Sequence, residues 1–240
     1  MNKILVIARK EFNSFLDSIS GYIVLILFLG ISGFFTWTGK SNIFYLGQAD
    51  LTGFFSIAFW TLFFFVPAIT MRSFAEEQNL GTLEILLTHP VSFWEAVAGK
   101  ALGALYLILL SLALTLPYFV TVAIIGSVDY GATVSGYLGL ILLSMAYISI
   151  GIFASTLSRN QIVAFLIALG IGIFFQLIFD LLAQISTGQL ANFFEFLSFR
   201  SHYETIARGV MDTKDLIYFL SVTYFFLYAS VTVLFMRKFK

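Results

Sequence analysis

Residues 136–156 read GYLGLILLSMAYISIGIFAST, a run without a single charged side chain. A bilayer core about 30 Å thick needs roughly 20 apolar residues in one helix. Polar and apolar residues do not alternate along the run, which argues against a strand of a transmembrane barrel. The stretch therefore predicts a membrane-spanning helix, and with it a chain whose solvent is lipid.

Five further runs of the same kind account for much of the remaining sequence. The overall composition agrees, because 60% of the 240 residues are hydrophobic and only 11% are charged, whereas a soluble domain carries about 25% charged residues. We expect an all-α polytopic membrane protein with one transmembrane domain over residues 1–240. The predicted spans are about 22–38, 54–71, 101–125, 136–156, 162–182 and 216–236.

The distribution of Lys and Arg predicts which side of the membrane each connection faces. Cytoplasmic segments carry an excess of these residues. With the N-terminus inside, the inner segments hold nine of them and the outer segments four. We therefore expect both termini in the cytoplasm, a cytoplasmic loop over residues 72–100 and an outer loop over residues 183–215.

The first 21 residues predict an amphipathic helix that lies in the cytoplasmic interface. Apolar residues recur at helical spacing while polar residues share the opposite side. A cleavable signal peptide is the alternative, but its apolar region would come earlier and a small-residue cleavage site would follow. The apolar face holds Ile4, Leu5, Ala8, Phe12, Phe15, Leu16 and Ile19, and the polar face holds Lys3, Lys10, Asn13, Ser14 and Asp17.

Several kinds of chemistry are excluded by what the sequence lacks. Without cysteine there is no disulfide, thiolate metal site or cysteine nucleophile, and the two histidines lie on opposite predicted sides of the membrane. Thirteen basic residues balance thirteen acidic ones, so no net charge points to nucleic acid. No glycine-rich phosphate loop follows a strand. We expect no metal and no cofactor bound by this chain, and no enzyme activity of its own.

Charged residues inside the predicted spans are rare. Proton and ion carriers place acidic or basic residues within their helices, and among the six runs only 162–182 contains one, Asp180, with Gln176 one turn away. These two residues form a possible polar pathway. The alternative, which we favour, is that Asp180 marks the interfacial end of the fifth span, where an acid costs little.

The cytoplasmic loop carries clear signals for helix ends. Gly81 can adopt the left-handed conformation that ends a helix, and Thr82 can cap the next one. Pro90 ends that second helix, because the residue before a proline avoids helical geometry. Ser92-Phe-Trp-Glu95 fits a capping box that opens the third helix, which continues into span three.

The short helix between Gly81 and Pro90 has one apolar face, formed by Leu83, Leu86 and Leu87. This spacing suits insertion into a groove on a partner protein. It suits a membrane surface equally well. The residues alone leave both interpretations open.

The loop resembles a known family signature. The matching residues are Arg72-x-Phe74-Ala-Glu-Glu77, Gly81-Thr-x-Glu84-x-Leu-Leu87-Thr-x-Pro90-x-Ser92 and Gly99-Lys100. They are similar to the signature of type-2 ABC exporter permeases, and the start at Arg9-Lys10-Glu11-Phe12 resembles that family's connecting helix. Chain size and the segment 208–216 most resemble the gliding-motility-associated subgroup.

This resemblance implies a bacterial inner-membrane permease. It would pair with a second permease, identical or homologous, and bind two copies of a separate ABC ATPase subunit, which would hold the ATP and Mg. The implied ATPase-coupling residues are Arg72, Glu76, Glu77, Gly81, Thr82, Leu83, Glu84, Leu86, Leu87 and Thr88.

The outer loop is rich in aromatic residues between 191 and 209. By the same resemblance, Phe196, Phe199 and Tyr203 are outer gate candidates, while an aromatic belt that anchors the fold is an equal alternative. His202 could form a pH-sensitive pair with Glu204, but its polar neighbourhood favours a surface histidine.

Two further functions remain open. A permease-like scaffold could anchor ATPases and transmit force to an envelope or motility machine, and a self-contained channel or carrier could act without nucleotide. Gly99-x-x-x-Gly103 permits close approach of another helix, either from a second permease or, by default, from the same chain.

Overall fold

The computed structural model describes residues 3–38, 50–82 and 91–238, and these residues form helices and their connections without any strand. The helices are α1 (Lys3–Leu16), α2 (Ile19–Thr38), α4 (Thr52–Thr70), α5 (Arg72–Asn79), α7 (Phe93–Ala113), α8 (Leu116–Ile125), α9 (Tyr130–Leu157), α10 (Gln161–Ile173), the π-helical turn η1 (Phe174–Ile178), α11 (Phe179–Ile185), α12 (Gln189–Leu197), α13 (Phe199–Ala207) and α14 (Thr213–Lys238).

Six helical segments are long and apolar enough to cross a membrane, which confirms the predicted number of spans. They extend beyond the uncharged runs: the second, for example, covers Thr52–Asn79. The uncharged length reports only the lipid core, whereas a helix continues into the headgroups and water.

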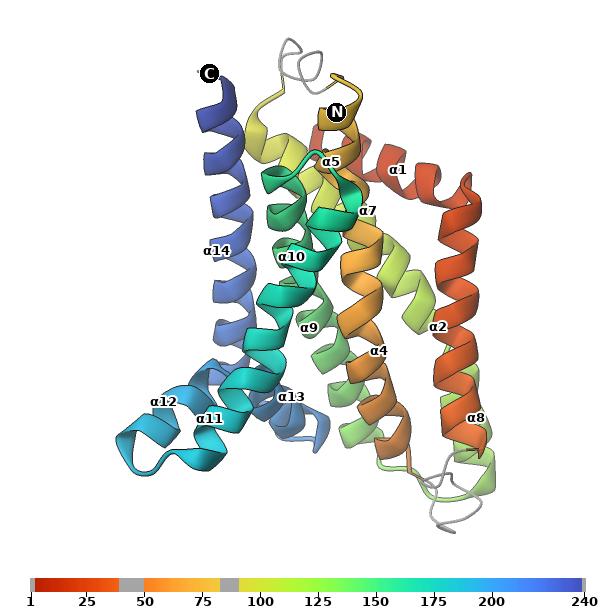
Figure 1. The fold of residues 1–240 in the computed structure, drawn as a ribbon. Helices are drawn as coiled ribbons and strands as arrows, with labels where there is room; N and C mark the ends of the chain where they lie inside the picture. The colour runs from red at the N-terminus through yellow and green to blue at the C-terminus, as the bar shows by residue number, and fades with distance from the viewer. Residues whose placement is uncertain (1–2, 39–49, 83–90, 239–240) are drawn as a thin grey trace.

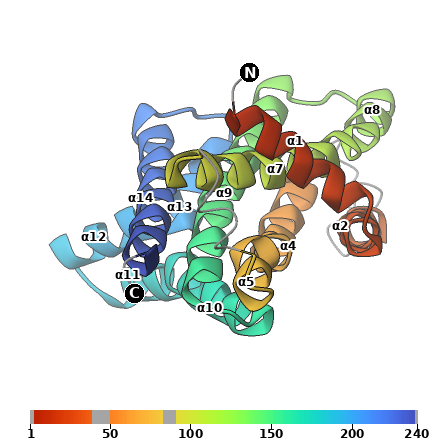
Figure 2. The same ribbon diagram turned by 90° about the horizontal axis from the view of Figure 1, so that it is seen from above.

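Helix α9 forms the centre of the bundle, packed against α4, α5, α7, α10, α13 and α14 (Figure 2). Small residues along α9 allow this close approach. Gly136 lies against the ring of Phe55, and a methyl group added at Gly151 would overlap the side chain of Thr70. The run that predicts a membrane span is thus the most enclosed helix of the protein.

Both termini lie at one end of the bundle, which we call the terminal end, and α12 and α13 lie at the opposite, far end (Figure 1). Helix α1 lies across the terminal end. It stops at Leu16, short of the predicted residue 21. The chain turns there because the Ser18 hydroxyl donates to Phe15 O and accepts from Gly21 N, so Ile19 belongs to the first span.

Two other predicted boundaries need correction. The predicted single helix over residues 101–125 is interrupted after Ala113, where Thr115 Oγ1 donates to Leu112 O at 2.6 Å and α8 begins with Pro117 in its first turn. A proline cannot donate the backbone hydrogen bond that a continuous helix needs. The fifth span continues past the predicted residue 182 to Ile185, and α12 and α13 are the helices that the pattern of residues 191–209 predicts.

Ser155 of α9 holds the junction between α4 and α5. Its hydroxyl accepts from Phe74 N at 2.8 Å and from Ala75 N at 2.9 Å, and donates to Met71 O at 3.0 Å. The first amides of a helix lack partners within the helix. Ser155 supplies those partners, and it fixes α5 against α9 at the terminal end.

Replacing Ser155 should therefore destabilise the protein more than replacing a serine that bonds only within its helix. We expect Ser155→Ala to lower the free energy of unfolding by about 1–3 kcal/mol, since two buried amides lose their acceptor. Ser144→Ala is the matched control, because Ser144 is equally buried in α9 and bonds only to Leu140 O. Melting temperatures in the same detergent measure the difference, and equal values would contradict this role.

Candidate functional site

Two segments at the terminal end flank residues 83–90, and we call them the two arms: α5 and residues 93–100 of α7. Gly81, just after α5, has a φ of 71°, which confirms the predicted left-handed conformation. The predicted capping box at Ser92 is also confirmed, with Glu95 N donating to Ser92 Oγ at 3.1 Å and Ser92 N to Glu95 Oε2 at 2.8 Å. The backbone therefore leaves one arm and enters the other where the sequence predicts.

The predicted coupling helix lies between the two arms. Five of the predicted coupling residues lie outside the described part of the chain, so their role in contacting an ATPase remains a prediction: Leu83, Glu84, Leu86, Leu87 and Thr88. The described coupling residues are Arg72, Glu76 and Glu77 on α5 and Gly81 and Thr82 after it.

A buried lysine joins the two arms to α1. Lys100 of α7 is 5% exposed, and its ammonium lies 2.8 Å from Glu77 Oε1 of α5 and 2.8 Å from Glu11 Oε1 of α1. The same ammonium lies 5.1 Å from the centre of the Phe74 ring. We call Lys100, Glu11 and Glu77 the charge triad.

The geometry of the charge triad fixes three helices relative to one another. A buried ammonium is costly unless opposite charges and hydrogen bonds compensate for the lost water. Glu11 and Glu77 provide both, and each keeps a fifth to a quarter of its side chain exposed. Separating α1 or α5 from α7 would leave the lysine with one partner, so the three segments are held as a unit.

Close backbone packing adds to this arrangement. Positions for a methyl group at Gly99 and Gly103 of α7 are already filled by Ile7 and Glu11 of α1. Arg72 at the start of α5 lies 4.3 Å above the centre of the Phe15 ring of α1, a cation–π distance. The Gly-x-x-x-Gly pattern is thus used here for packing within the chain.

The polar residues of α5 point in different directions. Glu77 faces inward to Lys100, whereas Glu76 is exposed. Gln78 is buried and donates to Ser155 O and Thr156 O, both at 3.2 Å, and it accepts from the guanidinium of Arg237 in α14. Of these three, Glu76 is the one whose side chain is free to meet a partner protein.

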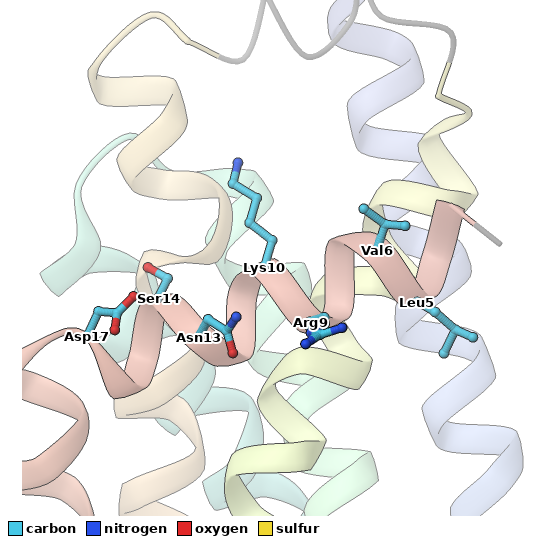
Figure 3. Close-up of a pocket in the computed structure, with 7 residues that line it drawn as sticks. All are labelled: Leu5, Val6, Arg9, Lys10, Asn13, Ser14 and Asp17. Atoms are coloured by element: carbon cyan, nitrogen blue, oxygen red, sulfur yellow. The ribbon is translucent and has the colours of Figure 1, made fainter. Parts of the chain in front are cut away.

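A shallow hollow runs along the side of α1 (Figure 3). Its lining combines apolar, basic, neutral polar and acidic side chains, and the figure shows them along the helix from Leu5 to Asp17. The lining residues are Leu5, Val6, Arg9, Lys10, Asn13, Ser14 and Asp17. This surface lies at the same end of the bundle as the two arms (Figure 1).

The three gate candidates occupy different environments at the far end. Tyr203 of α13 is buried, stacks on Phe59 at 4.9 Å and donates to Phe55 O at 3.1 Å, and its burial raises the pKa of its hydroxyl. Phe199 is buried beside Tyr147 and Phe175. Phe196 is 54% exposed. The buried side chains of Phe199 and Tyr203 thus pack α13 against the bundle, and α13 covers the far end.

The possible polar pathway is divided in the structure. Gln176, in η1, is buried and accepts from the Tyr147 hydroxyl, while its Nε2 has no partner among the described residues. Asp180 instead accepts from Arg200 at 3.2 Å and from Gln184 at 3.1 Å. Arg200 also donates to Glu204. This hydrogen bond is the main cause of the raised pKa of the Arg200 guanidinium.

Comparison with known families decides the class of the protein. The profile described as "ABC-2 family transporter protein" matches residues 5–238. The chain belongs to this family. A comparison with curated proteins returns no match.

Membership makes this ABC-2 protein the membrane-spanning permease subunit of an ABC transporter, which lies in a bilayer and works with ABC ATPase subunits. The two arms and the charge triad are then features of this permease subunit.

Several contacts of this ABC-2 permease were not foreseen from its sequence. The motif that contains Lys100 does not indicate that this lysine is buried, and no pattern in the sequence indicates the contacts of Tyr147 or Asp215. The sequence does carry a signal for Lys100, since it is a lone cation immediately before a long apolar run, where a charge needs a partner. The two carboxylates that pair with Lys100, those of Glu11 and Glu77, lie far from it in the sequence, and no such signal marks them.

Removing the lysine should expose the importance of the charge triad. We expect Lys100→Met to lower the free energy of unfolding by about 2–3 kcal/mol. This loss is smaller than that caused by breaking a fully buried ion pair, because both glutamates retain some water contact. Adding Glu11→Gln and Glu77→Gln should recover part of this loss. Lys214→Met is the control, since its exposed pair with Asp212 contributes about 1 kcal/mol at most. Thermal unfolding in detergent compares them, and equal losses for the two lysine variants would refute the role of burial.

Proposed function

We propose that this chain is the permease of an ABC exporter in the bacterial inner (cytoplasmic) membrane, acting with two ATPase subunits and a second permease, identical or homologous. ATP and Mg would bind to the ATPase subunits. The observation that carries the proposal is the charge triad, because it joins both arms of the predicted coupling segment to α1. The gliding-motility-associated subgroup remains a prediction from the resemblance alone.

The proposed orientation places the terminal end in the cytoplasm. Most of the described Lys and Arg side chains belong to this end, on α1, α5, the start of α7, the α9–α10 turn and the end of α14. Excess positive charge is typical of the cytoplasmic side. The arms and the hollow of α1 would then face the compartment that contains ATP.

The proposed coupling works through rigid helices. The segment between Gly81 and Pro90 would insert into a cleft of the ATPase by its leucine face, with Glu76 and Glu84 among the polar contacts. Movement of the ATPases during the ATP cycle would displace this segment. The charge triad would pass the displacement to α5, α7 and α1 together, because none of them can move alone without breaking an ion pair.

The route from the arms to the far end is direct. Helix α5 is bonded to α9 through Ser155 and to α14 through the pair of Gln78 and Arg237. Helix α9 also contacts α13, where Gly139 lies against Tyr203 and Ile206. A displacement of α9 would thus reach the helix that covers the far end, and ligand-dependent opening requires such differences in contacts between two states.

Two substitutions test the contact with the ATPase. We expect Glu84→Lys and Leu86→Asp each to abolish co-purification of the ATPase subunits, because the first reverses a charge and the second puts a carboxylate on the leucine face. Membrane insertion should remain normal in both. Mild-detergent purification from the native host with mass spectrometry measures the association, and Lys214→Met at the far end is the control. ATPase recovery at the control level in both variants would falsify the coupling assignment.

Other experiments separate the alternatives. A self-contained channel or carrier would transport solute in liposomes that contain this chain alone and no nucleotide. A force-transmitting scaffold would bind ATPases whose activity responds to no solute. Stimulation of the complex's ATP hydrolysis by a specific solute, with no transport by the isolated chain, is the result we expect for an exporter.

A further inference from the structure

The far end contains a buried histidine that the sequence does not explain. His202 of α13 is 4% exposed, so the expected surface histidine is wrong. The alternative pair with Glu204 is not formed either: Glu204 pairs with Arg200 and Arg208, while His202 Nδ1 lies 2.6 Å from Asp215 Oδ1 of α14. The second ring nitrogen, Nε2, lies 2.8 Å from the backbone oxygen of Phe196 in α12.

Hydrogen bonding at this histidine requires an additional proton. A neutral imidazole has one N–H donor and one bare, accepting nitrogen. Here the Phe196 carbonyl can only accept, so Nε2 must carry hydrogen, and Nδ1 then faces a carboxylate that also accepts. The 2.6 Å contact needs a second proton, either on Nδ1 or on Asp215. In both cases the pair holds one more proton than a neutral histidine beside a carboxylate.

Burial favours the same protonation. Asp215 is fully buried, and its Oδ2 has no hydrogen-bond partner among the described residues. An uncompensated carboxylate in such a place is costly, and a neighbouring imidazolium compensates its charge. The ring of Tyr218 stacks on His202 with centroids 4.0 Å apart, an arrangement that also favours a cationic imidazole.

Other charged groups near the pair do not supply a competing proton donor or cation. Glu195 of α12 and Lys214 of α14 line the same small hollow, and Lys214 pairs with Asp212. On α13, Arg200, Glu204 and Arg208 bond to one another or to Asp180. The Tyr218 hydroxyl donates to Leu197 O at 2.6 Å and the Tyr203 hydroxyl to Phe55 O.

We propose that His202 and Asp215 form a proton-binding site whose bound proton fastens α12, α13 and α14 together across the far end. Loss of the proton would leave a bare nitrogen facing an oxygen, replacing an attraction with a repulsion. The proton between the two side chains therefore holds the three helices together. The use of this fastening in transport rests on the proposed function, but the proton site itself does not.

Nitrogen NMR tests the proton count directly. The chain has two histidines, so the His89→Gln variant, selectively labelled with ¹⁵N-histidine in detergent, reports on His202 alone. We expect both ring nitrogens to give signals of protonated nitrogen in mildly acidic buffer. Asp215→Asn should shift one nitrogen to the signal of a bare, accepting nitrogen. A bare nitrogen in the parent protein beside an ionised Asp215 carboxylate, read from the ¹³C signal of that carboxylate, would overturn the proton site.

Cysteine labelling tests the fastening, because the chain has no cysteine of its own. Ser198 lies fully buried between α12 and α13, and Ser198→Cys is a nearly isosteric reporter. Leu190→Cys on exposed α12 corrects for the pH dependence of the thiol reaction itself. The corrected rate with a polar maleimide should rise about tenfold from mildly acidic to alkaline buffer, the effect of losing about one charge-assisted hydrogen bond.

The histidine itself provides the matched control. In Ser198→Cys/His202→Gln, labelling should be fast at both pH values, because glutamine cannot gain a charge. A corrected rate that does not change with pH in the Ser198→Cys protein would overturn the fastening. Neither experiment requires an ATPase or a transported solute, so failure here leaves the proposed exporter function standing, and loss of ATPase binding would leave this site standing.

Discussion

The arrangement at the terminal end depends on one buried positive charge. Lys100 lies on the helix that follows the predicted coupling segment, in a place where water cannot stabilise its ammonium. Two carboxylates must therefore come to it, one from the helix that precedes the segment and one from α1. This requirement explains why an N-terminal helix lies across the bundle at all, and why the chain on either side of residues 83–90 has a fixed spacing. The close packing at Gly99 and Gly103 follows from the same demand, since the carboxylate of Glu11 reaches the lysine only if the helices touch.

The two ends of the bundle are held by different kinds of interaction. At the terminal end, the charge triad and the bonds of Ser155 and Gln78 connect α1, α5, α7, α9 and α14. At the far end, aromatic rings pack α13 into the bundle, and the buried pair of His202 and Asp215 binds it to α12 and α14. In the proposed exporter, rigid contacts would lie near the ATPase subunits and separable contacts near the outer opening. The observed distribution of charge and aromatic packing agrees with that division.

How far sequence reasoning reaches depends on the range of the interaction. Uncharged runs predict the six spans because lipid imposes a length on each helix separately, and Gly81 and the Ser92 capping box mark helix ends through neighbours only three residues away. Contacts between distant residues were predicted less well. Nothing next to His202 in the sequence indicates Asp215, so its polar neighbours favour a surface histidine, and this prediction is wrong. The break near Thr115 was underestimated because the apolar pattern continues through it, and the coupling residues 83–88 fall outside the described chain.

The π-helical turn at residues 174–178 has a consequence for how this permease can vary. Such a turn contains one residue more than the regular helix would need. Deleting a residue there would rotate everything that follows by about 100°, carrying Asp180 away from Arg200 and turning α11 away from α12. The ion pairs of the far end are thus set by chain length within the fifth span as much as by the residues that form them. Homologous permeases with a shorter fifth span should accordingly attach their far-end helices through a different set of side chains.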